Sequence, residues 1–246
     1  MATSTVEDYL KSILLEEQAA PDELVSMGRI GAVLGVAPGT VTAMVKTLAD
    51  SGLVAYEPYS GVHLTAAGRQ LALHVLRRHR LVELFLVKVL KMDWSEVHGE
   101  ADGLEHAVSD RVLERLDEML GHPLVDPHGD PIPDARGVVP ERRLESLLEC
   151  PELVALAVAR VADQSPDFLQ LVERRGLMPG TRLMLLARDE AADTVELALP
   201  GGDRLSLGFR AASKILVLRV EAGGGSAGTG RSRATFPSSG DASGGP

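Results

Sequence analysis

Residues 27–53 read MGRIGAVLGVAPGTVTAMVKTLADSGL, and this stretch decides the fold of the first part of the chain. Its first half predicts a short helix that ends at Gly35, because glycine adopts the left-handed backbone of a helix C-terminus without strain. Pro38 and Gly39 then open a second helix, which Gly52 closes. An apolar stripe at helical spacing marks the buried face of that helix: Val41, Met44, Val45 and Leu48. The stretch therefore predicts a helix, a tight turn and a second helix.

The flanking residues complete a winged helix-turn-helix. Residues 5–17 carry apolar side chains at helical spacing, and Thr5 is the expected N-cap. Residues 53–65 predict a β-hairpin, or wing, whose turn is formed by residues 59–61. We expect residues 1–73 to form one domain.

The rest of the chain changes from helical to β-rich. Helical periodicity runs from Ala66 to about Leu90, over 93–106 and over 110–120, and a proline-rich loop follows. We assign residues 74–140 to a second, helical domain, 150–221 to a small barrel of four or five strands, and 222–246 to a disordered Gly/Ser-rich tail. The predicted class is mainly α with small β.

Composition restricts the kind of protein. The chain has 246 residues, 45% of them apolar, which is enough for a substantial core in two or three domains. It shows neither a run of about 20 apolar residues nor a signal peptide, so we expect a cytoplasmic protein outside the membrane. The single cysteine, Cys150, cannot form an internal disulfide, and we interpret it as a buried apolar residue.

Charge is unevenly distributed. The formal net charge is −10, yet residues 29–80 carry six basic and two acidic residues. This local excess is compatible with contact to DNA phosphates, while the acidic residues after it suit a cation. The candidate DNA contacts on the second helix and the wing are Pro38, Gly39, Thr40, Thr42, Ala43, Lys46, Tyr59 and Ser60. A winged helix that binds another protein remains an alternative.

Histidines and acids recur at helical spacing after residue 78. His98, Asp102 and Glu105 fall on one helical face with His106 beside them, and His79 and Glu83 are four residues apart. A solvated acidic face would explain any one of these pairs. Together they favour a metal site, because a cation relieves the crowding of carboxylates and imidazoles. Nitrogen and oxygen donors without sulfur suit Mn(II), leave Fe(II) possible, and make a closed structural zinc site improbable.

Several motifs in this order resemble the diphtheria-toxin-repressor/manganese-transport-regulator family. They are VEDYLKSI, GVAPGTVTAMVKTLADSGLV, LTAAGR, RRHRLVELFL, VHGEADGLEHAVSD and DPHGDPIP, which together cover roughly residues 5–135. The β-rich remainder is similar, more loosely, to the SH3-like (FeoA-like) domain of that family. The resemblance implies a helical metal-binding and dimerisation domain after the winged helix.

The resemblance also implies two metal sites. The primary one would use Asp8, Asp102, Glu105 and His106, and the ancillary one His79, Glu83 and His98. The iron-responsive branch carries Met and Cys where Asp8 and Asp102 stand, which favours manganese here. Compact manganese regulators have a second acid where this chain has Lys11. In some relatives a Cys-Pro-His segment, here residues 126–128, joins the ancillary site. This makes Asp126, His128, Asp163 and Asp167 weaker candidates.

We therefore expect a homodimeric, Mn(II)-dependent transcriptional repressor that controls metal uptake genes and binds double-stranded DNA at a palindromic operator. An Fe(II)-dependent repressor of the same family is the alternative. Two other classes remain open: a metal-dependent hydrolase and a metal-binding interaction module without affinity for DNA. The chain lacks a recognisable nucleophile motif or phosphate-binding loop, so we do not expect an enzyme.

Overall fold

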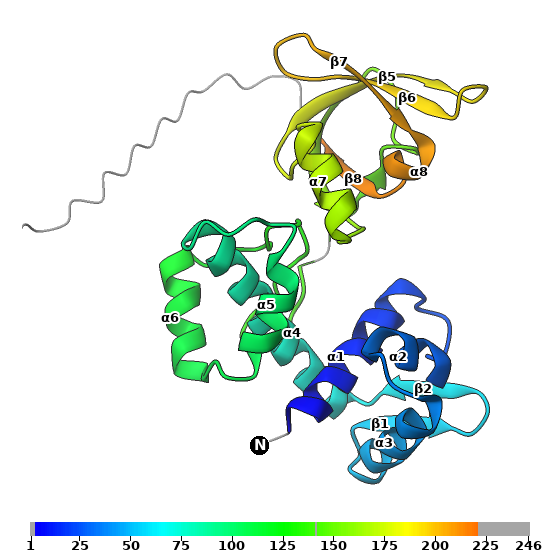
Figure 1. Ribbon diagram of the computed structural model, residues 1–246, viewed down its shortest axis with the longest axis vertical. Helices are drawn as coiled ribbons and strands as arrows, with labels where there is room; N and C mark the ends of the chain where they lie inside the picture. Colours follow the sequence, from blue (N-terminus) through cyan, green and yellow to red (C-terminus); the bar gives the residue numbers. More distant parts are fainter. Residues whose placement is uncertain (1–2, 141, 221–246) are drawn as a thin grey trace, which may run out of the picture.

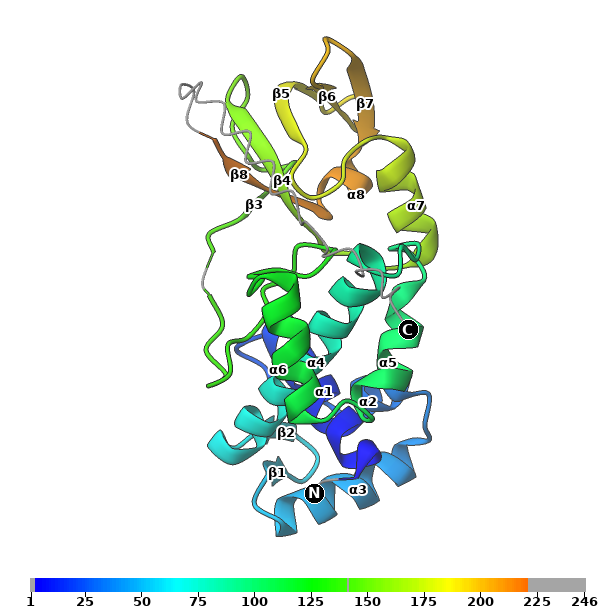
Figure 2. The ribbon, with the colours of Figure 1, turned by 90° about the vertical axis from the view of Figure 1, so that its left-hand side faces the viewer.

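The computed structural model describes residues 3–140 and 142–220. Its elements form three groups stacked along the long axis (Figure 1). The winged-helix elements lie at one end, helices α4 to α6 in the middle, and a β-sheet with two helices at the other end, an order that the second view preserves (Figure 2). The expected fold class, mainly α with small β, is confirmed. The predicted tail, 222–246, lies outside the described residues.

The first group is a winged helix-turn-helix. Its elements are α1 (Ser4–Ala19), α2 (Met27–Leu34), α3 (Pro38–Asp50), β1 (Val54–Glu57) and β2 (Gly61–Leu64). Gly35 caps α2 with a φ of 66°, and β1 pairs antiparallel with β2. The predicted N-cap of α1 is wrong by two residues: Thr3, not Thr5, accepts the hydrogen bond from the Val6 amide. Both threonines can cap, and Thr3 is the one whose backbone is extended.

The middle group consists of three helices: α4 (Ala66–Lys88), α5 (Val97–Glu105) and α6 (Asp110–Leu120). Helix α4 is long enough to belong to two groups, since Leu76 packs into the winged-helix core and Val82 packs against α5. The predicted helix over 93–106 starts later, at Val97, because Asp93 turns the chain by accepting hydrogen bonds from Ser95.

The last group is a six-stranded antiparallel sheet in the order β3-β8-β4-β5-β6-β7. Its elements are β3 (Glu145–Ser146), β4 (Ala155–Val161), α7 (Pro166–Arg174), β5 (Arg182–Asp189), β6 (Thr194–Ala198), β7 (Arg204–Gly208), α8 (Phe209–Ala212) and β8 (Ile215–Arg219). The expected four or five strands were too few, because the two-residue β3 is too short to give an alternating pattern. Cys150 is fully buried in this core, as expected, and so is nearly all of Trp94.

No single helix in the described part of the chain is long and apolar enough to cross a membrane. Helices α2 and α3 pass such a test only as a pair, with a bend of 108° between them.

Gly68 provides a test of how α4 joins the winged helix. A Cβ atom there would lie 1.9 Å from the carbonyl oxygen of Leu53, whereas at Gly28 in α2 its nearest neighbour would be Oγ of Ser26 at 4.0 Å, an ordinary contact. We expect Gly68→Ala to lower the free energy of unfolding by about 1–3 kcal/mol through overpacking. Gly28→Ala should leave it within about 1 kcal/mol or raise it. Urea unfolding of both variants measures this, and equal stabilities would contradict the close approach.

Candidate metal centre and DNA-binding surface

Two helices carry most of the candidate metal ligands. Helix α4 places His79 and Glu83 one turn apart, and α5 presents His98 and Glu105 toward it from positions about two turns apart. His79 and Glu83 are almost fully buried and Glu105 is completely buried, while the His98 side chain is about half exposed. Buried carboxylates and imidazoles require partners, so their arrangement decides what the centre can bind.

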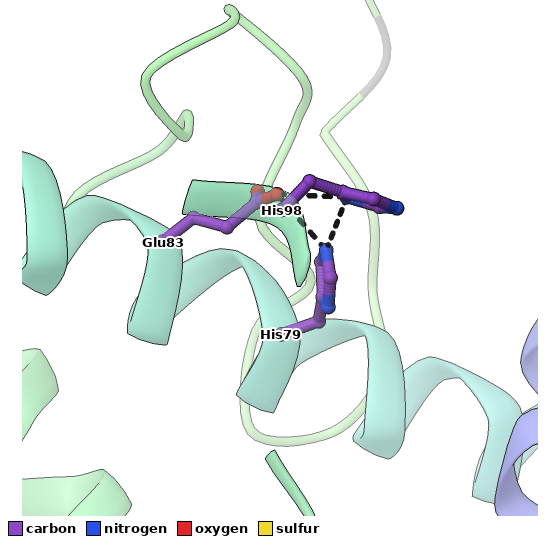
Figure 3. A group of neighbouring side chains, drawn as sticks. All are labelled: His79, Glu83 and His98. Carbon is purple, nitrogen blue, oxygen red and sulfur yellow. Dashed lines mark hydrogen bonds and ion pairs between the residues drawn. The ribbon is translucent and has the colours of Figure 1, made fainter. Parts of the chain in front are cut away.

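His79, Glu83 and His98 converge as the sequence predicted (Figure 3). Nε2 of His79 lies 3.0 Å from Oε1 of Glu83 and 3.1 Å from Nδ1 of His98, and the latter is 3.1 Å from the same oxygen. Three ligand atoms within 4.8 Å of one another are able to surround one ion. Two imidazoles and a carboxylate suit a divalent transition metal.

A third imidazole faces the same glutamate. His128 is completely buried, and its Nε2 donates a hydrogen bond to the carbonyl oxygen of Trp94, 2.9 Å away. In a neutral ring with this donor, Nδ1 carries the lone pair. It has no hydrogen-bond partner among the described residues and lies 3.9 Å from Oε2 of Glu83. An orphaned, buried imidazole nitrogen is costly without a ligand to accept its lone pair. The donor set fits a metal ion, with Asp126 as a further nearby carboxylate.

The turn that carries His128 also receives the C-terminal sheet. Oδ1 of Asp126 accepts hydrogen bonds from the amides of His128 and Asp130, which shapes the turn. The Val161 amide of β4 donates to the carbonyl oxygen of His128 at 2.9 Å, and Arg160 forms an ion pair with Asp130 at 2.6 Å. These contacts connect the sheet to the turn that carries His128, and His128 faces the group of His79, Glu83 and His98, which we call the ancillary group.

The two weak candidates in the sheet group are not brought to this centre. Asp163 forms an ion pair with Lys214 and accepts a hydrogen bond from the Ser165 amide. Burial by itself raises the pKa of Asp163, but the interactions with Lys214 and Ser165 together outweigh it and lower the pKa to about 2. Among the described residues, neither Asp163 nor Asp167 belongs to a group of potential metal ligands.

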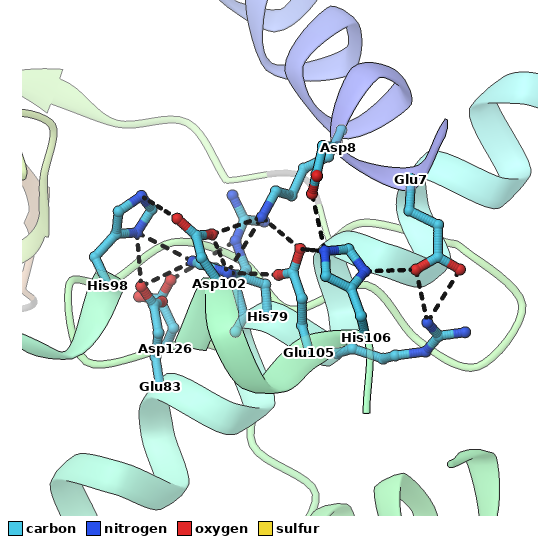
Figure 4. Close-up of polar contacts among 12 residues, drawn as sticks. Glu7, Asp8, His79, Glu83, His98, Asp102, Glu105, His106 and Asp126 are labelled. Carbon is cyan, nitrogen blue, oxygen red and sulfur yellow. Dashed lines mark hydrogen bonds and ion pairs between the residues drawn. The ribbon is translucent and has the colours of Figure 1, made fainter. Parts of the chain in front are cut away.

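A second group joins α1 to α5, and we call Asp8, Glu105 and His106 the seam (Figure 4). Nε2 of His106 lies 2.9 Å from Oδ1 of Asp8 and 3.4 Å from Oε1 of Glu105. The other ring nitrogen of His106 contacts Oε2 of Glu7 at 2.7 Å, and Arg78 forms an ion pair with Glu7. A carboxylate that holds the second nitrogen orients a ligating imidazole.

The predicted primary set is divided in the structure. Asp102 lies not with Asp8 but in a separate group with His79 and Glu105. Lys11 forms ion pairs with Asp102 at 2.8 Å and with Glu105 at 2.7 Å. In the sequence, Lys11 stands out only as a departure from relatives. Its position one turn after Asp8, on the same face of α1, was the available signal that it reaches the same acids.

Electrostatics around the two groups favour positive charge. Burial disfavours the charged ring of His79, but hydrogen bonds to Asp102, Glu105 and Glu83 outweigh it and raise the pKa of His79 well above its ordinary value. The pKa of His106 is raised in the same way, because its contacts with Glu7 and neighbouring acids outweigh burial. The raised pKa values mean that protons compete with a metal for the ring nitrogens of His79 and His106.

The candidate DNA contacts lie on exposed parts of α3 and the wing. Pro38, Gly39, Thr40, Ala43, Lys46, Tyr59 and Ser60 are exposed, and Thr42 is partly buried. Tyr59 is fully exposed at the wing tip, where its φ of 66° is unusual for a bulky residue. The Thr42 hydroxyl donates to the carbonyl oxygen of Pro38 in its own helix. The surface presents one positive side chain, Lys46, beside small and polar ones.

Most of the basic residues in the segment 29–80 are neutralised by ion pairs within the protein. Five of the six basic residues form ion pairs with acids of the chain: Arg29, Arg69, Arg77, Arg78 and Arg80. Among the described residues, Lys46 is the one of the six without such a pair. The charge count therefore overstated the phosphate-binding surface, and the geometry of α3 and the wing is the stronger argument for DNA.

Family models cover nearly the whole described chain. Residues 1–62 match the iron-dependent repressor N-terminal DNA-binding domain, and 65–134 match its metal-binding and dimerisation domain. The chain belongs to the iron-dependent repressor family. Residues 145–219 match the FeoA domain, which agrees with the expected SH3-like third domain. The protein is a metal-dependent DNA-binding repressor, and the expected resemblance is confirmed.

Relatives of both metal classes match most of the chain. The iron-dependent repressor IdeR of Mycobacterium leprae is 32% identical over 88% of this chain and 97% of its own length. A manganese-dependent transcriptional repressor solved with manganese is 40% identical, with a TM-score of 0.78, over 87% of this chain and all of that one. ScaR with bound Cd²⁺ is 33% identical with a TM-score of 0.71, over 87% of this chain and 99% of that one. Because the matched relatives are repressors, the expectation that the chain is not an enzyme is confirmed.

The raised pKa values of His79 and His106 predict that metal binding depends on pH. Each proton displaced makes the affinity for Mn(II) fall about tenfold per unit as the pH is lowered. Because both pKa values lie above their ordinary value, the decline should begin above pH 6.5. Calorimetric titration with Mn(II) in buffers of different ionisation enthalpy measures the protons released. Binding without proton release between pH 6 and 8 would contradict this assignment.

Proposed function

We propose that the protein is a Mn(II)-dependent homodimeric repressor that binds a palindromic operator and controls metal uptake genes. The observation that carries the choice of metal is the donor set, which consists of carboxylate oxygens and imidazole nitrogens without sulfur. The one cysteine is buried within the sheet core, away from both groups. Hard oxygen donors with a few imidazoles suit Mn(II).

Two sets of residues would hold metal. The seam residues Asp8, Glu105 and His106, with Asp102 nearby, would hold the primary ion. His79, Glu83 and His98, with His128 and Asp126, would hold the ancillary ion. A bound metal supplies positive charge that the converging acids require. Glu7 orients His106, and the His128 turn connects the ancillary set to the sheet. We assign no metal role to Asp163 or Asp167.

The regulatory step follows from where the seam lies. Asp8 belongs to α1, which packs within the winged helix, while Glu105 and His106 belong to the dimerisation half. Fixing α1 against α5 would set the orientation of α3 relative to the dimer. Metal would then favour DNA binding by stabilising the DNA-competent arrangement more than the loose one.

The dimer and the domain bounds belong to the same proposal. Helices α5 and α6 expose large apolar side chains, Leu104, Val112 and Met119, which suit a second copy of the chain. A symmetric dimer would place two α3 helices about one DNA turn apart, on a palindrome. We retain 1–73, 74–140 and 150–221 as the three domains, and the cytoplasm as the site of DNA binding.

An Fe(II)-dependent repressor is the second candidate, because the chain aligns with nearly all of an iron-dependent relative. Selection of bound duplexes from random DNA by the purified protein separates the two. It is run in parallel with chelator, Mn(II) and anaerobic Fe(II).

We expect one palindrome to be enriched with Mn(II) and not with chelator, and Fe(II) to be much weaker. Stronger enrichment with Fe(II) would overturn the choice of metal. Equal enrichment with chelator, Mn(II) and Fe(II) would overturn the regulatory role of the seam. If no sequence is enriched under any of the three conditions, operator binding by this chain is overturned.

A further inference from the structure

The side chain of Lys11 reaches from α1 into the acids of α5. Its Nζ lies 2.8 Å from Oδ1 of Asp102, 2.7 Å from Oε1 of Glu105 and 3.4 Å from Nδ1 of His79, and the side chain is only 12% exposed. A mostly buried ammonium with two carboxylate partners is held in place, because leaving it without them would be costly.

These three neighbours form one of the groups that could hold a metal ion. Lys11 already supplies a positive charge to both acids of that group. The other charged groups that face this region contact different partners. Arg78 forms an ion pair with Glu7, and Glu7 also contacts His106. Glu83 contacts His79 and His98. Among the described residues, Lys11 is thus the lysine or arginine side chain that pairs with both Asp102 and Glu105.

Lys11 also binds an oxygen that the seam needs. Oε1 of Glu105 accepts from Lys11 at 2.7 Å and lies 3.4 Å from Nε2 of His106, which in turn contacts Asp8. The other oxygen of Glu105 is bound by His79. A metal ion held by Asp8, Glu105 and His106 would therefore have to share this carboxylate with the ammonium group of Lys11. Two cations that contact the same carboxylate repel each other.

We infer that Lys11 is a tethered cation that joins α1 to α5 in the metal-free protein and competes with the activating metal for Glu105. The inference rests on the proposed metal role of the seam. The consequence follows from thermodynamic linkage. The Lys11 contacts stabilise the metal-free state, and metal binding weakens them, so they lower the affinity for metal. Lys11 would thus raise the metal concentration at which the repressor responds.

Three variants of the full-length protein test the inference. Lys11→Met removes the charge and keeps the length of the side chain, and Lys11→Arg keeps the charge. Lys88→Met, at an exposed position at the end of α4, is the matched control. Hydrogen exchange of α1 amides is measured without metal, and Mn(II) affinity is measured by equilibrium dialysis.

We expect α1 amides of metal-free Lys11→Met to exchange at least about tenfold faster than those of the wild type. We also expect Mn(II) to bind this variant at least about tenfold more tightly, because the competing cation is gone. Lys11→Arg and Lys88→Met should exchange like the wild type. Unchanged exchange together with unchanged or weaker Mn(II) binding in Lys11→Met would overturn the inference.

A measurement on the wild type avoids any folding defect of a variant. Labelling with an amine-reactive reagent, followed by mass spectrometry, reports how accessible and reactive each lysine amine is. Lys11 should react slowly without metal and several-fold faster with saturating Mn(II), while Lys88 stays constant. If the protein binds Mn(II) but Lys11 is labelled equally fast with and without it, the proposed competition between Lys11 and the metal is wrong. If dialysis detects no Mn(II) binding to the wild type, the proposed function fails instead, and metal-free hydrogen exchange still tests the link between α1 and α5.

Discussion

The buried carboxylate of Glu105 is the constraint on which the centre depends. The side chain is completely buried, and both of its oxygens are used, one by Lys11 from α1 and the other by His79 from α4. A buried carboxylate without such partners would be strongly unfavourable. Three helices, which also pack through apolar side chains, therefore meet at one buried charge. In the proposed mechanism, the cation at this position helps to set how α1, and with it the winged helix, lies against the dimerisation half.

His79 connects the two groups of ligands. Its Nδ1 contacts Glu105 beside the seam, while its Nε2 faces Glu83 and His98. A ring nitrogen that ligates a metal is oriented by the hydrogen bond of the other nitrogen, so occupancy of one group affects the other. The ancillary group extends further through His128, whose carbonyl oxygen accepts from β4. Polar groups of the winged helix, the helical domain and the sheet thus lie close together around Glu83, with a gap of 3.9 Å between Glu83 and His128.

Local sequence patterns predicted the helices well, and they placed the candidate ligands of each helix on a common face. Spacings of three and four residues placed Glu105 and His98 on one face of α5, and Gly35 ended α2 where expected. What failed depends on contacts between distant segments. Sequence spacing does not show that Arg78 is paired with Glu7, that Asp102 is separated from Asp8, or that a lysine of α1 reaches Glu105. The buried state of His128 depends in the same way on how Trp94 and the sheet pack around it.

The most direct test of this account is Mn(II) binding to Glu105→Gln, followed by electron paramagnetic resonance and compared with the wild type. The substitution keeps the shape of the side chain and removes its charge. The account predicts that the seam-bound ion is lost and that Mn(II) no longer strengthens operator binding. Ions held by His79, Glu83 and His98 should remain. A variant that binds as many ions as the wild type, with the same affinity and the same response on DNA, would contradict the central role of Glu105.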